Sequence, residues 1–134
     1  MTTSSELLSF AEYRFISLAT FRKSGVAVAT PVWVVRDGDA LLVTTPTGTG
    51  KLKRLANNTD VEFRPCSRSG KVADGAPVAY ATAEVIDTPE LRAHNVALLK
   101  KKHGVEYAIF TFVEGFFRKN DSRNVTIRLT PREG

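Results

Sequence analysis

The residues best suited to bind an anion lie in the segment TTPTGTGKLKRLANN, residues 44–58. Threonines and two glycines there precede three cations, Lys51, Lys53 and Arg54. The segment is not a Walker loop, because that motif needs a glycine where Thr45 stands and a hydroxyl residue where Leu52 stands. It also lacks the dinucleotide-binding fingerprint, because Lys53 occupies the place of the third glycine.

The same segment still favours an anion on physical grounds. Its apolar spacing predicts a helix from about Thr49 to Asn57, with Leu52, Leu55 and Ala56 on the inner face. Lys51 then lies in the first turn, where a cation opposes the helix dipole. A bound phosphate would meet both the cations and the free backbone N–H groups. The alternative is a solvated polar loop, and the residues alone leave both interpretations open.

Other candidate residues are less specific. Trp33 follows a Thr-Pro-Val sequence and could lie against a flat ring, or belong to the core or an interface. Arg68 and Lys71, in the CSRSGK loop, could bind a carboxylate or phosphate, or simply be surface cations. His94 and His103 are nine positions apart on one predicted helix, which is wrong for a metal pair, and we expect both at the surface. We predict no metal site and identify no catalytic side chain, so a cofactor would supply the chemistry of any reaction.

The elements that must position these residues are mainly strands. Turn signals such as Asp37-Gly38 separate short β-rich segments, and Pro31 suits an edge or a bulge of its strand. Successive hairpins imply an antiparallel barrel that closes its own edges. We predict six strands near residues 14–21, 26–35, 40–45, 60–65, 78–87 and 123–131, the last with Val125, Ile127 and Leu129 inward, and helices over 5–12, 49–57 and 89–103. The last helix has Thr88 as its cap and Gly104 as its stop, whereas residues 105–117 fit helix or strand equally.

Composition limits the class of protein. The 134 residues are enough for one domain, which we place over residues 1–134. A net charge of +5 and a pI near 9.6 favour an anionic partner. A single cysteine, Cys66, suits a reducing compartment. The N-terminus lacks a signal-peptide pattern and no apolar run is long enough to span a membrane, so we expect a cytoplasmic protein without a membrane partner.

The chain from Ser17 to Lys71 resembles the flavin- and deazaflavin-dependent oxidoreductases of the split-barrel class, which are related to pyridoxamine-phosphate oxidase and include the PPOX-class F-420-dependent enzymes. The matching motifs are TPVW, DGD, TT followed by GKLKRLANN, and CSRSG after DVEFRP, in that order. The weaker AYATAEVID and VTIRLTP extend the resemblance over most of the chain. The family's usual R-x-D-G turn is RKSG here, so no role is carried onto Lys23 or Ser24.

The resemblance implies a six-stranded antiparallel split β-barrel of the FMN-binding type, working as a homodimer with two cofactor sites at the interface. It implies that Thr45, Thr49, Lys51 and Arg54 contact a cofactor phosphate. The strand Thr30, Pro31, Val32 and Trp33 would lie along the cofactor ring. Arg68 and Gly70 would belong to a loop near the cofactor tail.

Charge helps to choose the cofactor. Coenzyme F-420 carries a phosphodiester and a tail of several carboxylates, whereas FMN carries one phosphate. Five nearby cations, namely Lys51, Lys53, Arg54, Arg68 and Lys71, exceed what one phosphate needs, so we favour F-420, with FMN as the alternative. The expected activity is hydride transfer between the deazaflavin and a small organic substrate that the sequence does not name.

Two other classes of function remain as alternatives. A cofactor carrier without turnover would share the same site. A basic barrel that binds single-stranded nucleic acid would need exposed aromatic side chains for base stacking. Because alternation predicts that Phe15, Phe21 and Phe63 are buried, we do not expect a nucleic-acid partner.

Overall fold

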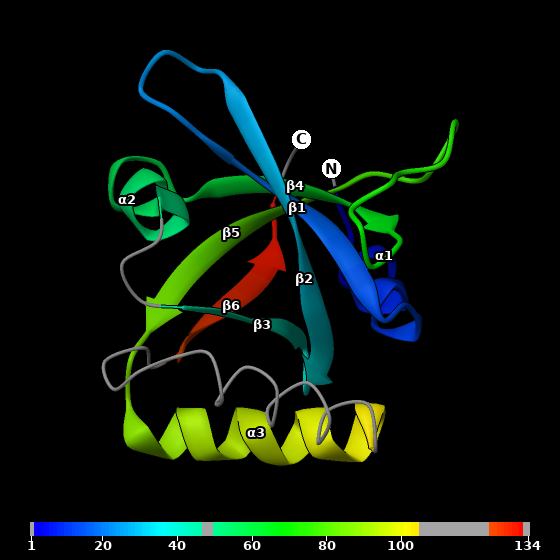
Figure 1. Cartoon of the computed structure of the whole chain (residues 1–134), viewed down its shortest axis with the longest axis vertical. Coiled ribbons are helices and arrows are strands. Elements are labelled where there is room, and N and C mark those ends of the chain that lie inside the picture. Colours follow the sequence, from blue (N-terminus) through cyan, green and yellow to red (C-terminus); the bar gives the residue numbers. More distant parts are fainter. Residues whose placement is uncertain (1, 47–49, 105–123, 133–134) are drawn as a thin grey trace.

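Six antiparallel strands close into one barrel in the part of the chain that the structure describes, residues 2–46, 50–104 and 124–132 of a computed structural model. The strand order around the barrel is β1-β2-β3-β6-β5-β4 (Figure 1). The strands are β1 (Phe15–Phe21), β2 (Ala27–Asp37), β3 (Ala40–Pro46), β4 (Asp60–Cys66), β5 (Ala79–Ile86) and β6 (Asn124–Pro131). This architecture confirms the predicted mainly-β, six-stranded antiparallel barrel, and each strand lies within two residues of its predicted bounds.

The core of the barrel is built by the alternation that the sequence predicted. Val125, Ile127 and Leu129 of β6 are all buried and face inward. Figure 1 shows helices α1 (Ser4–Ser9) and α2 (Gly50–Asn57) on opposite sides of the barrel. Leu7 of α1 and Leu55 of α2 both join the barrel core, so each helix is held by apolar burial worth roughly 1.5–3 kcal/mol per leucine.

The N-terminal helix is shorter than predicted. It was expected over residues 5–12, but α1 ends at Ser9 and a single 3-10 turn, Phe10–Glu12, continues the chain toward β1. Its cap is Thr3, whose hydroxyl accepts from the Glu6 N–H at 3.1 Å.

Strand β2 is split between two environments. Residues 27–33 pair with β1, whereas only residues 34–37 pair with β3. Pro31 lies opposite Ser17, in the part of β2 that pairs with β1 and with no other described strand. This agrees with the predicted edge position. In the following hairpin Asp37 pairs with Ala40, so the turn residues are Gly38-Asp39, one residue later than expected.

Helix α3 (Pro89–His103) packs on the outside of the barrel, mainly against β2 and β6. The Thr88 hydroxyl accepts from the Leu91 N–H at 3.2 Å, and Gly104, at φ 56°, ends the helix, as predicted. Leu99 packs with Val35 and Leu42 in a second apolar cluster, separate from the barrel core. This helix therefore adds a second layer to one side of the barrel (Figure 1). Residues 105–117, whose structure the sequence left open, lie outside the described part of the chain.

The end of α3 is fixed by contacts that the sequence did not predict. His103 stacks on Trp33 with ring centroids 4.6 Å apart and an interplanar angle of 16°. The Lys102 ammonium donates to the backbone carbonyl of Tyr13 at 2.6 Å and also to that of Val34. The surface prediction holds for His94, which is exposed and lies 2.9 Å from an Asp37 oxygen, but is wrong for His103, because His103 shares the inner face of α3 with Leu99.

Candidate functional site

Helix α2 places a lysine inside one end of the barrel. Lys51 and Leu55 are four residues apart, so they share the helix face that packs on the strands. Leu55 is in the core, and the Lys51 side chain is only 6% exposed. The predicted inner face is therefore partly wrong: Leu52 packs at the margin of the core, Ala56 is exposed, and Lys51 takes the buried position.

The buried Lys51 ammonium has little to compensate its charge. Its Nζ lies 3.5 Å from the hydroxyl oxygen of Thr45, a buried residue near the end of β3, which is the outer limit of a hydrogen bond. It forms no ion pair with a carboxylate among the described residues. Burial, together with the nearby charge of Arg54, lowers the pKa of Lys51 from 10.5 to about 8. A buried cation without a counter-ion costs folding free energy, so this position favours a bound anion.

A second cation lies beside Lys51 and has a fixed orientation. The Arg54 Nε donates to the hydroxyl of Thr20 at 2.6 Å, and Thr20 is fully buried on β1. The guanidinium also passes close to Gly50, where a Cβ would lie 2.8 Å from the Arg54 Nη1. Sequence analysis did not identify Thr20. Thr20 follows Ile16 and Leu18 at the alternate, inward-facing positions of β1. A hydroxyl residue in place of an apolar one at such a position is the sequence signal that could have identified it.

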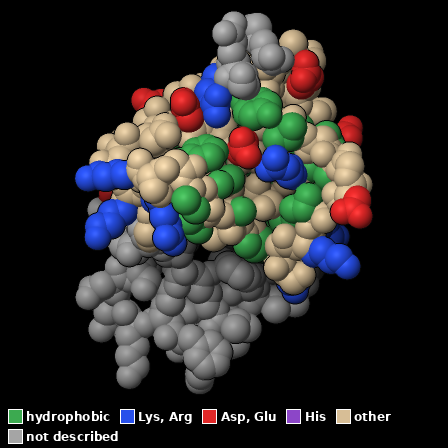
Figure 2. Space-filling model, turned by 90° about the horizontal axis from the view of Figure 1, so that it is seen from above, with side chains coloured by type: hydrophobic (Ala, Val, Ile, Leu, Met, Phe, Trp, Pro, Cys, Tyr) green, Lys and Arg blue, Asp and Glu red, His purple; other side chains and the backbone are tan. Residues whose placement is uncertain are grey.

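Thr20, Thr45, Lys51 and Arg54 together form what we call the α2 anion site. Two hydroxyls from neighbouring parts of the barrel and two cations from the first turn and a half of α2 converge there. This donor set suits a phosphate group, which accepts charge-assisted hydrogen bonds and interacts favourably with a helix N-terminus. Figure 2 shows several Lys and Arg side chains on the side of the molecule where α2 lies, and others spread over the rest of this face. Thr49, predicted as a further contact, lies outside the described residues.

The β2 residues predicted to lie along a cofactor ring point in different directions. Val32 faces the barrel core, so only its backbone is available to a ligand. Trp33 faces α3 and is partly buried against His103. Pro31 is exposed. The Thr30 hydroxyl is buried and has no hydrogen-bond partner among the described residues, so this polar group is unsatisfied within them.

The loop after β4 contacts the same strand. Gly70, at φ 92°, lies beside β2, and a Cβ there would make an ordinary contact of 3.4 Å with a ring carbon of Pro31. The hydroxyl oxygens of Ser67 and Ser69 are 2.9 Å apart, and the Lys71 N–H donates to the Ser67 hydroxyl at 3.1 Å. Glycine is therefore favoured at this position by its positive φ and not by close packing.

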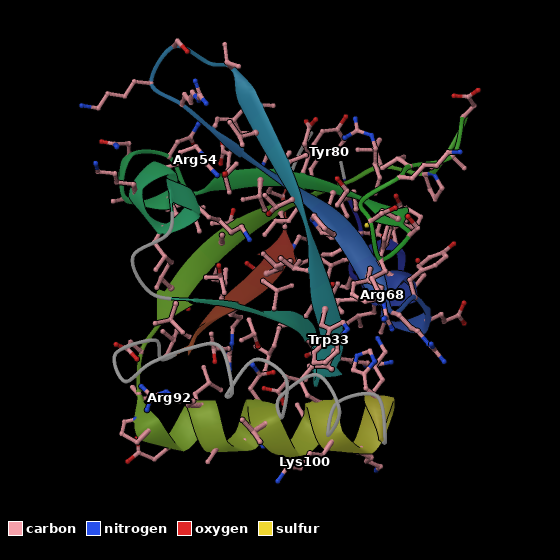
Figure 3. The ribbon with its side chains drawn as sticks, in the orientation of Figure 1. Trp33, Arg54, Arg68, Tyr80, Arg92 and Lys100 are labelled. Carbon is pink, nitrogen blue, oxygen red and sulfur yellow. The ribbon has the colours of Figure 1, made fainter. Side chains whose placement is uncertain are left out.

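A single chain does not bring all the predicted site residues together. Figure 3 shows Arg54 beside α2, Arg68 on the opposite side of the barrel near α1, and Trp33 between β2 and α3. The α2 anion site is thus a compact group, whereas the β2 strand and the loop carrying Arg68 are separate from it. Within the described residues, no three His, Cys, Asp or Glu side chains are placed to hold a metal ion.

The aromatic residues of β1 are less buried than predicted. Phe63 is fully buried, but Phe15 and Phe21 are partly exposed. They stand at odd positions of β1, whereas Ile16 and Leu18 occupy the inward, even ones. Phe15 instead packs against Trp33, with centroids 6.3 Å apart.

The chain matches a known family of proteins. The family model of pyridoxamine 5'-phosphate oxidase matches residues 4–134, almost the whole chain. The chain therefore belongs to the pyridoxamine 5'-phosphate oxidase family, as the sequence resemblance indicated. No curated protein sequence is significantly similar to it.

Solved structures share this fold at low sequence identity. HutZ, the heme storage protein from Vibrio cholerae, superimposes with a TM-score of 0.66 at 18% identity, over 100% of this chain and 93% of that one. A conserved hypothetical protein from Mycobacterium tuberculosis gives 0.68 at 19%, over 99% and 82%. An F420 reductase gives 0.57 at 19%, over 93% and 92%. The fold is thus shared by proteins of different function.

No helix in the described part of the chain is both long and apolar enough to cross a membrane.

Proposed function

We propose that the protein is a coenzyme F-420-dependent oxidoreductase that transfers a hydride between the deazaflavin and a small organic substrate. The observation that carries the proposal is the buried Lys51 ammonium, which lies beside the Arg54 guanidinium with no carboxylate partner among the described residues. Two adjacent cations repel each other, and an anion between them removes that cost. The phosphate of a cofactor is the anion that the family and the donor set favour.

F-420 fits these residues better than FMN on charge. Its phosphodiester would meet Lys51, Arg54 and the Thr45 hydroxyl, and its carboxylate tail needs further cations. Arg68 and Lys71, on the loop after β4, are exposed cations suited to that tail, whereas the exposed Lys53 lies two residues from Lys51 and on a different side of α2. The structural similarity to an F420 reductase supports this choice. FMN is the alternative within the same site.

The chain's own contribution is binding and orientation. When bound, F-420 supplies the two-electron hydride chemistry. Lys51 and Arg54 would fix the phosphate end, and β2 would support the ring through the exposed Pro31 and the backbone of Val32. The buried hydroxyl of Thr30, which has no partner within the described ranges, could donate to a ring heteroatom. No side chain is assigned as a proton donor.

A heme-storage function is not favoured by the same residues. Axial ligation of heme iron would need a histidine or a similar ligand. His94 faces Asp37, and His103 stacks on Trp33. Both histidines of the chain are therefore already held in other contacts. A carrier that binds F-420 without turnover remains the second candidate, because it would use the same site.

The proposed function is tested by titrating F-420, FMN and hemin separately into the purified protein and recording absorbance spectra. We expect F-420 to bind more tightly than FMN, with an affinity that falls as salt is added, because exposed charges contribute. Tighter FMN binding, or a yellow FMN-loaded protein after expression, would replace the assignment by the FMN alternative. Hydride transfer from reduced F-420 to any acceptor would separate the enzyme from the carrier.

A further inference from the structure

The Arg54 side chain is restrained at three points along its length. Its backbone is in α2, its Nε donates to the Thr20 hydroxyl at 2.6 Å, and its Nη1 lies over Gly50. Thr20 is fully buried on β1, so its hydroxyl cannot move to follow a mobile arginine. The Nε hydrogen bond fixes the plane of the guanidinium, because all its nitrogens lie in that plane. The four N–H bonds of the two Nη groups remain for other acceptors.

Gly50 provides the space that this orientation requires. A Cβ there would lie 2.8 Å from the Arg54 Nη1, closer than non-bonded atoms approach. The conflict would be with the far end of a flexible side chain, not with backbone. An alanine at this position would therefore displace the guanidinium with little cost to the fold. Glycine at the first residue of a helix otherwise gives no stability advantage over alanine.

We propose that Thr20 and Gly50 are positioning residues that hold the Arg54 guanidinium toward the N-terminus of α2, so that Arg54 and Lys51 are oriented for a phosphate before it binds. The inference rests on the proposed function, because it assigns these two residues a part in recognising the phosphate of the cofactor. A long arginine side chain that is already ordered loses less conformational entropy when the ligand arrives. Removing the restraint should therefore weaken binding although Lys51 and Arg54, the two cations proposed to meet the phosphate, both remain.

The test compares Thr20→Val, Thr20→Ser, Gly50→Ala and Arg54→Ala, with Lys53→Ala as a control that removes an exposed charge from the same helix. Valine keeps the shape of Thr20 without its hydroxyl, whereas serine keeps the hydroxyl. We expect Thr20→Val and Gly50→Ala each to weaken F-420 binding about three- to tenfold. Thr20→Ser should recover most of the loss seen for Thr20→Val. Gly50→Ala should melt no lower than the parent.

A double-mutant cycle distinguishes positioning from a general structural effect. If Thr20 acts through Arg54, Thr20→Val should weaken binding in the parent but not in an Arg54→Ala background. Equal losses in both backgrounds would overturn the inference. The inference would also be overturned if Arg54→Ala lost affinity while Thr20→Val and Gly50→Ala bound F-420 like the parent. The proposed function would stand in that case.

Inorganic phosphate serves as a second probe, so that failure of the cofactor assignment can be recognised separately. Phosphate binding that depends on Thr20, Gly50 and Arg54, without F-420 binding, would support the positioning role and overturn the F-420 assignment. A parent protein that binds neither phosphate nor F-420 would overturn both. Binding of each probe is read by NMR shifts of the α2 backbone amides as well as by affinity.

Discussion

Lys51 is the residue whose environment differs most from that of an ordinary surface lysine. It is almost completely buried, its hydrogen-bond partner among the described residues is the neutral hydroxyl of Thr45, and its neighbour Arg54 carries the same charge. The empty protein therefore bears a free-energy cost that a bound anion would offset. Such an arrangement is common where function, not stability, determines the residue.

Replacing Lys51 by methionine tests this cost directly. Methionine keeps most of the apolar stem and removes the charge, so the free energy of unfolding at pH 7 should rise by about 1–3 kcal/mol. F-420 affinity should fall about ten- to a hundredfold, because a charge-assisted hydrogen bond is lost. Lys53→Met is the matched control: Lys53 is exposed, so its change should alter stability by less than about 0.5 kcal/mol. Denaturant unfolding and absorbance titration measure both quantities, and equal affinities for the two variants would remove Lys51 from the site.

The lowered pKa of Lys51 predicts how stability depends on pH. Below pH 8 the lysine is protonated in both the folded and unfolded states, and the folded state bears the full cost of burying the charge. Between about 8 and 10.5 the folded state has lost this proton while the unfolded state still holds it, so the free energy of unfolding should rise with pH. Burial lowers the pKa of Lys102 to about 8 as well, and its contribution has the same sign.

The contribution of Lys51 is isolated by comparing the parent with Lys51→Met at pH 7 and pH 9.5, since both retain Lys102. We expect the stability advantage of the variant to shrink as the pH rises. F-420 affinity of the parent should fall over the same range, because the neutral amine no longer attracts the phosphate. An advantage that stays constant from pH 7 to 9.5 would show that Lys51 titrates as an ordinary lysine.

At the scale of elements, local signals in the sequence were sufficient for the barrel. The Thr88 cap, the Gly104 stop and the alternation in β6 are each short-range patterns, and each of these features forms where it was expected. The hairpin turn moved by one residue because strand pairing, and not the dipeptide alone, sets which residues occupy the turn. Local chemistry thus predicts which elements form more reliably than where they end.

The side-chain partners of those elements could not be predicted in the same way. Hydrophobic periodicity assigned Ala56 to the inner face of α2, because it counts apolar residues and treats a lysine as solvated. The barrel instead accommodates Lys51 where Thr45 can accept from it. The contacts between Arg54 and Thr20, and between His103 and Trp33, join residues far apart in the chain, so no local pattern contains them.

Helix α3, which packs on the outside of the barrel, contacts β3, the strand that contributes Thr45 to the α2 anion site. Asn95, which is buried in α3, donates to the hydroxyl of Thr44 of β3 at 2.6 Å. Thr45, the residue after Thr44, faces the other side of β3 and accepts from Lys51. β3 is therefore held from both faces at the point where it leads toward α2. This gives the α2 anion site a rigid support on the side of Thr45.

At the scale of the whole molecule, the separation of the predicted contacts favours a shared site. Arg54 and Arg68 lie on opposite sides of one barrel (Figure 3), so a single cofactor that meets both would draw them from two protomers. Residues 27–33 of β2 pair with one neighbouring strand, and hydrophobic side chains gather in the middle of the face shown in Figure 2. Exposed apolar surface of this kind marks interfaces in many proteins. We therefore expect a homodimer, with a mass near twice 14.7 kDa by light scattering.

Mixing two defective variants tests whether the protomers share the site. Lys51→Met and Arg68→Ala each alter one contact in every site of their own homodimer, so each should bind F-420 weakly. If a site takes Lys51 from one protomer and Arg68 from the other, a mixed dimer has one site with both changes and one site with neither. Equal amounts, unfolded together and refolded, should then recover tight binding at about a quarter of the sites of the parent. If both residues came from the same protomer, the mixture would recover none, and a protein that remains monomeric at micromolar concentration would contradict the shared site altogether.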